Sequence, residues 1–348
     1  MSDPTQTVLA VEAVEAVPQA SVEDSARLEK AMQRRQRIAT IAQGQGLLVM
    51  LLLIVIYFAS ASPYFFTVSN ALTIGASAAA LGIMAVTQTF LIISGGIDVS
   101  VGSVVALSGV VMGILITGGW SFWIAAAAAV LSGVAVGLVN AVLVVGLKVN
   151  PFIATLGTMS LFSGLAFTLT SGETRVMNNP VLTFIGLESI LGMPTPLVVF
   201  LVVFVIALIV ERFTSWGRTI YAIGGNAEAA RLSGLKVRST QTVLYILSST
   251  SAAVAGILIT AQLASASPQV GATYLLSVIT AVILGGASLS GGRGTLIGTL
   301  VAVAILGVLA NGFALLGWST NAQTMALGIA LIFAVLLDQT TRKLRGQT

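Results

Sequence analysis

Residues 99–147 read VSVGSVVALSGVVMGILITGGWSFWIAAAAAVLSGVAVGLVNAVLVVGL, without one Asp, Glu, Lys or Arg. Charges are also absent from residues 38–97, 239–292 and 294–337. Each run is long enough for two helices of about 20 residues, the length that crosses a hydrocarbon layer about 30 Å thick. The runs are continuously apolar and do not alternate with period two, which favours helices over a transmembrane barrel. The pattern therefore predicts an all-α polytopic membrane protein.

The composition excludes several classes of function. Only 8% of the 348 residues are charged, and 56% are hydrophobic, whereas soluble domains carry charge on about 25% of their residues. Because the chain has no Cys and no His, it has no disulfide framework, thiol nucleophile, Cys/His metal site or His-dependent triad. No metal site is expected. The net charge of +4 is read as a signal of membrane topology and not of a nucleic-acid partner.

Division of the charge-free runs at Gly, Pro, Asn and Ser clusters predicts about ten membrane spans. Two of them are bounded on one side only by a Gly-rich turn, which could instead be re-entrant: 99–117 and 273–290. The ten predicted spans are 47–61, 70–94, 99–117, 121–146, 150–170, 195–210, 241–262, 273–290, 294–317 and 321–337.

The cations test this count through the positive-inside rule. With a cytoplasmic N-terminus, ten spans leave Arg175 as the one external cation. The rule therefore predicts that both termini are cytoplasmic. The predicted internal cations are Arg27, Lys30, Arg34, Arg35, Arg37, Lys148, Arg212, Arg218, Arg231, Lys236, Arg238, Arg293, Arg342, Lys343 and Arg345.

The predicted domain organisation has one transmembrane domain at 47–338 between two cytoplasmic tails. The tail 1–46 is expected to be largely disordered, with a basic end next to anionic membrane lipid. The second tail is 339–348. The longest external connection, 171–194, contains prolines that are expected to limit helix formation. The longest internal connection, 211–240, is the one extended charged surface predicted for a soluble partner.

The internal connection contains a predicted short helix. Asn226 is a good N-cap for residues 227–233, Glu228 lies favourably near the positive end of that helix, and Gly234 ends it. The small side chains of Ala229, Ala230 and Ser233 would let another protein surface approach closely. A helix lying on lipid is the alternative, but it would bury one large apolar side chain, which is too little. We therefore interpret the segment as a docking helix.

The loop resembles a known family. Residues 217–234, with the pattern G-R-x-x-Y-A-x-G-G-N-x-x-A-A-x-x-S-G, look like the cytoplasmic coupling loop of ABC-importer permeases, in the form found in ribose-type sugar permeases. Three further stretches match the same family: GGIDVSVGS at 95–103, VNPFIATLGTM at 149–159 and GGASLSGGRGT at 285–295. The resemblance extends in order from about residue 47 to 337 and leaves out 1–46.

The resemblance implies an ABC-importer permease fold in the cell (inner) membrane, with three kinds of protein partner. These are a second permease copy, an ATPase with two nucleotide-binding cassettes, and an extracytoplasmic sugar-binding protein. ATP and Mg would lie on the ATPase, because this chain has no Gly-Lys pair for a phosphate-binding loop. The implied ATPase-coupling residues are Gly217, Arg218, Tyr221, Gly224, Gly225, Asn226, Glu228, Ala229, Ala230, Ser233 and Gly234.

Polar residues in the spans are candidates for the translocation pathway. Asp98 is the one acid between Glu29 and Glu173. It would cost about 2.5–3.5 kcal/mol at the centre of a bilayer, but the predicted topology puts it at a cytoplasmic turn, where the cost falls. Capping of the next helix is favoured there over contact with substrate.

The other pathway candidates lie on neighbouring spans. Asn150 is an expected N-cap with Pro151 after it, and Asn140, Thr155 and Thr158 offer the hydroxyl and amide groups that recognise sugars. The alternative, hydrogen bonds between helices worth about 0.6 kcal/mol each, is equally supported. Gly157 is expected to allow tight helix packing.

The stretch 289–293, LSGGR, resembles the signature loop of ABC ATPases. Since the chain lacks a phosphate-binding loop, we interpret it as a Gly-rich turn at the inner face. The residues of this predicted turn are Gly285, Gly286, Gly291, Gly292 and Arg293.

The sequence predicts a non-enzymatic permease subunit of an ATP-driven importer for ribose or a similar monosaccharide. Permeases for branched-chain amino acids, nucleosides or inositol are alternatives within the same class. A secondary transporter is disfavoured because ion-coupled carriers bury several ionisable groups in their spans. A membrane enzyme is least supported, for want of a nucleophile beside a base.

Overall fold

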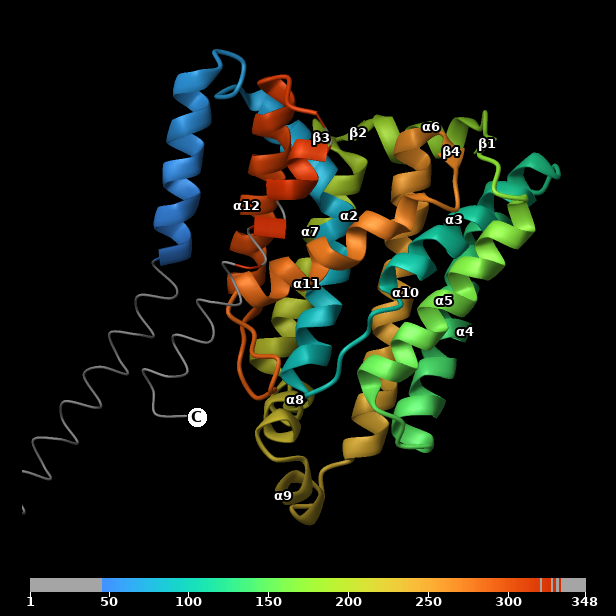
Figure 1. Cartoon of the computed structure of the whole chain (residues 1–348), viewed down its shortest axis with the longest axis vertical. Coiled ribbons are helices and arrows are strands. Elements are labelled where there is room, and N and C mark those ends of the chain that lie inside the picture. Colours follow the sequence, from blue (N-terminus) through green and yellow to red (C-terminus); the bar gives the residue numbers. More distant parts are fainter. Residues whose placement is uncertain (1–45, 320, 327, 330–331, 333–348) are drawn as a thin grey trace, which may run out of the picture. The chain divides into compact units, whose positions relative to one another are not determined.

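The computed structural model describes residues 46–319, 321–326, 328–329 and 332. These residues are mostly helical (Figure 1). The helices are Gly46–Ala61, α2 Val68–Ile93, α3 Val101–Thr117, α4 Phe122–Ala141 with a π-helical turn at Val142–Gly146, α5 Pro151–Thr170, α6 Pro180–Leu187, α7 Thr195–Phe213, α8 Ser215–Gly225, α9 Ala227–Leu232, α10 Val237–Leu263, a 3₁₀ turn Val270–Thr273 leading into α11 Tyr274–Leu284, and α12 Leu296–Leu315.

Each of the first nine predicted spans overlaps a helix, although the span 273–290 extends six residues beyond the end of α11 at Leu284. Six of these helices are long and apolar enough to cross a membrane: α2, α4 with its π turn, α5, α7, α10 and α12. Gly46–Ala61, α3 and the segment Val270–Leu284 are apolar but shorter. The tenth predicted span, 321–337, begins in a helical segment at 321–326, and the rest of it lies partly outside the described residues, as do both predicted tails.

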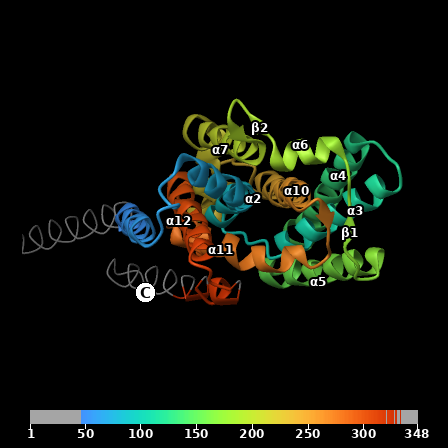
Figure 2. The ribbon, with the colours of Figure 1, turned by 90° about the horizontal axis from the view of Figure 1, so that it is seen from above.

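The core forms around α2 and α10, as the view in Figure 2 shows. In their most apolar stretches 83% of the residues of α2 and 67% of those of α10 are buried, against 22% for α5 and for α7. A helix that is apolar on all sides and buried belongs to the interior. The exposed apolar faces of α5 and α7 are therefore available to lipid or to another protein.

Glycine lets α4 and α10 approach each other closely. A Cβ atom at Gly137 would lie 2.7 Å from Ile246 Cα and 2.9 Å from Tyr245 O. Gly157 on α5 has no atom within 4 Å of the place where its Cβ would be. The prediction that Gly157 allows tight helix packing is therefore wrong within this chain.

The two ends of the helices differ (Figure 1). One end carries α6 and two short antiparallel pairs, β1 (Arg175–Val176) with β4 (Ser265–Ala266), and β2 (Ser189–Ile190) with β3 (Met193–Pro194). The prolines of 171–194 were expected to limit helix formation, but Pro180 begins α6 directly after its N-cap Asn179, where a missing N–H costs nothing. The opposite end carries α8 and α9, and α8 was not predicted.

The contrast between Gly137 and Gly157 is testable. Gly137→Ala should lower the thermal unfolding temperature of the detergent-solubilised protein, because overpacking costs about 1–3 kcal/mol. Gly157→Ala should leave it unchanged or raise it slightly, because Ala is the better helix former. Equal unfolding temperatures for the two variants would contradict the close contact of α4 with α10.

Candidate functional site

The turn that leads into α8 is built by a threonine and a glycine. Thr214 Oγ1 accepts a hydrogen bond from Gly217 N at 3.1 Å and donates to Val210 O at 2.7 Å. A Cβ atom at Gly217 would overlap the backbone carbonyl oxygens of Val210 and Glu211. The first glycine of the predicted coupling loop is thus required by the sharp turn between α7 and α8, while Arg218 beside it is exposed.

The caps of α9 are as the sequence predicts, although the helix ends one residue early, at Leu232. Asn226 Oδ1 accepts from Ala229 N at 2.9 Å. Gly234 has φ +83°, and Leu235 N donates to Ala230 O at 3.1 Å, which closes the C-terminal end. The sequence therefore fixes this short helix locally, and no packing partner is needed to define its ends.

Exposed charges lie along α9. Arg231 Nε and Nη2 donate to the two carboxylate oxygens of Glu228 at 2.9 and 2.5 Å. This pairing holds the pKa of Glu228 below its ordinary value and raises that of Arg231. Both side chains are more than half exposed, so the pair adds little stability and is free to meet a partner.

The prediction that Ala229, Ala230 and Ser233 all face a partner is wrong for one of them. Ala230 is only 5% exposed and packs inside the chain. Ala229 and Ser233 are exposed, and Leu232 is 73% exposed. We call the exposed set the docking face, which consists of Glu228, Ala229, Arg231, Leu232 and Ser233.

The end of α8 packs against two glycine-rich turns. Gly292 N donates to Ile93 O at 2.8 Å. A Cβ atom at Gly224 would overlap Ile93 O, and one at Gly291 would lie 2.9 Å from Gly224 O and 3.2 Å from Gly95 N. Three motifs that lie far apart in the sequence, 95–103, 217–234 and 285–295, therefore meet at the α8–α9 end.

The other members of these motifs have separate positions. A Cβ atom at Gly285 would lie 2.6 Å from Thr299 N. The absence of a side chain at Gly285 therefore lets the end of α11 lie close to α12. Gly286 has φ +91° in the turn that follows. Arg293 O accepts from Ser288 N at 3.0 Å and closes the loop between them. A Cβ atom at Gly225 would meet no atom within 4 Å.

Tyr221 joins α8 to the start of α12. Its hydroxyl donates to Glu211 Oε1 at 2.7 Å and lies 2.9 Å from Gly294 O. Burial and the hydrogen bond to Glu211 raise the pKa of Tyr221 well above its ordinary value, so it remains a donor at neutral pH. Sequence reasoning missed Glu211, although an acid at the very end of an apolar span was a signal.

Asp98 is completely buried within the protein. The expectation that its carboxylate would lie in a cytoplasmic turn at a low cost of desolvation is therefore wrong. Its Oδ1 accepts from Ser100 N at 2.9 Å and from Ser100 Oγ at 2.5 Å, which is the expected contact with the start of the next helix. Its Oδ2 accepts from Ser248 Oγ at 2.9 Å and Ser249 Oγ at 3.4 Å. The serines of α10, missed by sequence reasoning, thus satisfy a buried carboxylate.

Three more pathway candidates join this network. Asn140 Nδ2 donates to Ser100 Oγ at 2.9 Å, and Thr158 Oγ1 donates to Asn140 Oδ1 at 2.7 Å. Thr155 Oγ1 accepts from Val99 N at 3.1 Å. All three are buried, and the geometry is that of interhelical hydrogen bonding and not of an open pathway. Asn150 is exposed and caps α5 through Phe152 N and Ile153 N.

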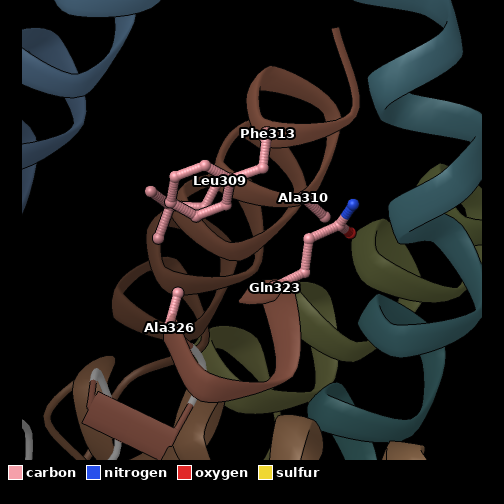
Figure 3. Close-up of a pocket in the computed structure, with 5 residues that line it drawn as sticks. All are labelled: Leu309, Ala310, Phe313, Gln323 and Ala326. Atoms are coloured by element: carbon pink, nitrogen blue, oxygen red, sulfur yellow. The ribbon is translucent and has the colours of Figure 1, made fainter. Parts of the chain in front are cut away.

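A small pocket lies elsewhere, between α12 and the segment 321–326 (Figure 3). Its lining is apolar apart from one amide side chain, and it contains none of the predicted site residues. The residues around it are Leu309, Ala310, Phe313, Gln323 and Ala326.

Residues 70–336 match a family described as the permease component of the branched-chain amino acid transport system. The ribose import permease RbsC of Bacillus subtilis is 39% identical over 88% of this chain and 96% of its own length. The chain belongs to this permease family. It is a multi-pass protein of the cell membrane, and it is a permease subunit of an ABC importer.

Other relatives of the permease are named for different solutes. The L-arabinose ABC transporter permease AraH of Azospirillum brasilense is 37% identical over 81% of this chain and 84% of its own length. The autoinducer 2 import permease LsrD of Yersinia enterocolitica is 36% identical over 74% and 79%. No solved structure matches the chain.

The buried network of the permease yields a stability prediction. Asn140→Leu should lower the unfolding temperature, because Ser100 and Thr158 lose a buried partner, at about 1–3 kcal/mol for an unsatisfied group. Thr168→Val on the exposed face of α5, which removes a hydroxyl that only bonds its own helix at Gly164 O, is the control. If both variants have the unfolding temperature of the wild type, the network is not needed for stability.

Proposed function

We propose that two copies of the permease form the membrane pathway of an importer that carries ribose or a similar monosaccharide. In this proposal the transmembrane domain is 47–338, with ten spans and both tails, 1–46 and 339–348, in the cytoplasm. Support for the sugar comes from relatives that are named for ribose and L-arabinose. Support for the orientation comes from the cations around α8 and α9.

The observation that carries the coupling mechanism is the docking face on α9. A separate ATPase with two cassettes would bind it, with ATP and Mg held on that subunit and no cofactor on this chain. Small side chains at Ala229 and Ser233 let the partner approach, Leu232 supplies apolar area, and the Glu228–Arg231 pair supplies orientation. When ATP draws the cassettes together, contacts that differ between two states of the permease shift it between inward-facing and outward-facing forms.

The pathway itself is assigned away from the buried network. Asn140 and Thr158 bond each other inside the chain, and Thr155 bonds the backbone of Val99 and Pro151. The poorly buried face of α5 instead presents Gly157, Ser160, Gly164 and Thr168. Small and hydroxyl-bearing residues on an exposed membrane helix suit contact with a second copy across a polar path.

Selectivity would reside in an extracytoplasmic sugar-binding protein. The charge-free spans offer no cluster that would bind a sugar tightly, and weak binding in a pathway favours release. Relatives that carry different names, from ribose to autoinducer 2, agree with a permease type that is not the main determinant of specificity.

The docking face is tested by Ala229→Trp, with Val202→Trp on the exposed side of α7 as the control. The bulky side chain should reduce binding-protein-stimulated ATP hydrolysis by tenfold or more, since a clash at a small interface residue costs at least about 1.4 kcal/mol. Membrane insertion should be unaffected because the position is exposed. The measurement uses the permease reconstituted in liposomes with its ATPase and binding protein, over a panel of ribose, arabinose, xylose and galactose.

Wild-type hydrolysis and co-purification of the ATPase with Ala229→Trp would refute this docking site. Loss of ATP hydrolysis in the control Val202→Trp as well would instead show that a bulky side chain at either position acts through general misfolding.

A further inference from the structure

Glu211 is a charged residue that neither the coupling-loop motif nor the pathway uses. It lies in the last turn of α7, half-buried, before the motif begins at Gly217. Its Oε1 accepts from Tyr221 Oη at 2.7 Å and from Leu296 N at 3.1 Å. One carboxylate oxygen thus joins the end of α7, the middle of α8 and the first residue of α12. We call Glu211, Tyr221, Gly294 and Leu296 the Glu211 joint.

The position is unfavourable for α7 alone. A negative charge is repelled by the negative C-terminal end of its own helix and attracted by the positive N-terminal end of another. Glu211 lies at the C-terminal end of α7 and at the N-terminal end of α12. Hydrogen bonds to an ionised acceptor are stronger than those between neutral groups. The carboxylate therefore stabilises the association of α8 and α12, not α7 itself.

The joint links helices that the chain connects only at a distance. From α8 the backbone continues through α9 into α10, and α12 begins at Leu296, after α11. The hydrogen bond from Gly292 N to Ile93 O adds a second link, from the turn before α12 to the end of α2. A displacement of α8 would therefore pull on α12 and α2 through noncovalent contacts as well as on α7 and α10 through the backbone.

We infer that Glu211 is a positioning residue that transmits movement of the docking helix α9 to α12. This inference rests on the proposed docking of an ATPase to α9. The joint would make α8 and the start of α12 move as one unit. The movement would then reach the packed helices α2 and α12 and would not be lost in bending of the α8–α9 segment.

The first test uses Glu211→Ala, Glu211→Gln and Tyr221→Phe in the liposome assay, read as sugar taken up per ATP hydrolysed. Glu211→Ala and Tyr221→Phe should lower this ratio about tenfold, the loss expected when a hydrogen bond to a charged group is removed. The double variant should be no worse than either single one, because the two groups act through one interaction. Glu211→Gln should recover part of the ratio, because its carbonyl oxygen can accept both bonds but carries no negative charge.

Tyr64→Phe is the matched control, since Tyr64 is 73% exposed in the connection before α2, and it should keep the wild-type ratio. A merely structural role would lower yield and unfolding temperature without changing uptake per ATP. If Glu211→Ala does not fold, Tyr221→Phe decides, because it keeps the ring and removes only the hydroxyl.

The second test exploits the absence of Cys from the chain. Spin labels at Ala227→Cys on α9, outside the docking face, and Ile297→Cys on α12, both exposed, report whether the two helices move together. On ATP binding, the distribution of distances between the two labels should stay narrow in the wild type and broaden in Glu211→Ala.

The outcomes separate the two proposals. If Ala229→Trp abolishes coupling while Glu211→Ala and Tyr221→Phe keep the wild-type ratio and a narrow distance, the joint is refuted and the docking site stands. If Ala229→Trp has no effect on ATP hydrolysis, the docking site is refuted. A narrow distribution of label distances in Glu211→Ala then refutes the joint as well.

Discussion

The interior of this permease is organised around a carboxylate that is buried within the protein. Asp98 is fully buried, and an ionised or even a neutral carboxyl group in that place must be given donors by the protein. Ser100 supplies two, and Ser248 and Ser249 of α10 supply two more. Asn140 Nδ2 donates to Asp98 Oδ1 at 3.5 Å. Because the serine donors come from the start of α3 and from α10, satisfying the carboxyl group fixes the start of α3 against α10.

Asn140 and Thr158 extend the same constraint to α4 and α5. These helices are apolar and have no hydrophobic driving force for association inside a lipid bilayer. Close glycine contacts, such as Gly137 against Ile246, and a fully satisfied polar network supply what the hydrophobic effect does not. The result is a packed group of helices whose relative positions are specified by a few named atoms.

In the proposed mechanism, movement enters this group at the α8–α9 end. There, three glycine-rich segments meet, and the contact of Gly224 with Ile93 O leaves no room for a side chain. Asp98 follows Ile93 by only five residues in the sequence. The α8–α9 segment is therefore in direct contact with the last residue of α2, which leads into the turn that holds the buried carboxylate. The Glu211 joint gives it a second connection, to α12. A subunit that binds α9 would act on both.

Local signals in the sequence determined the membrane class, the positions of the apolar helices, the caps of α9 at Asn226 and Gly234, and the N-cap Asn150. Each of these depends on residues within a few positions of one another, through hydropathy over one helix length or through one side chain and a nearby amide. The same reasoning could not show that Asp98 and Ala230 are buried within the protein, or that a Cβ atom at Gly157 would meet no neighbour. Those outcomes depend on residues that are 40 to 150 positions apart, such as Asn140 and Ser248 around Asp98. The tertiary structure alone decided them, because a hydrogen bond or a close contact between helices is fixed by packing in space and leaves no mark in the local pattern.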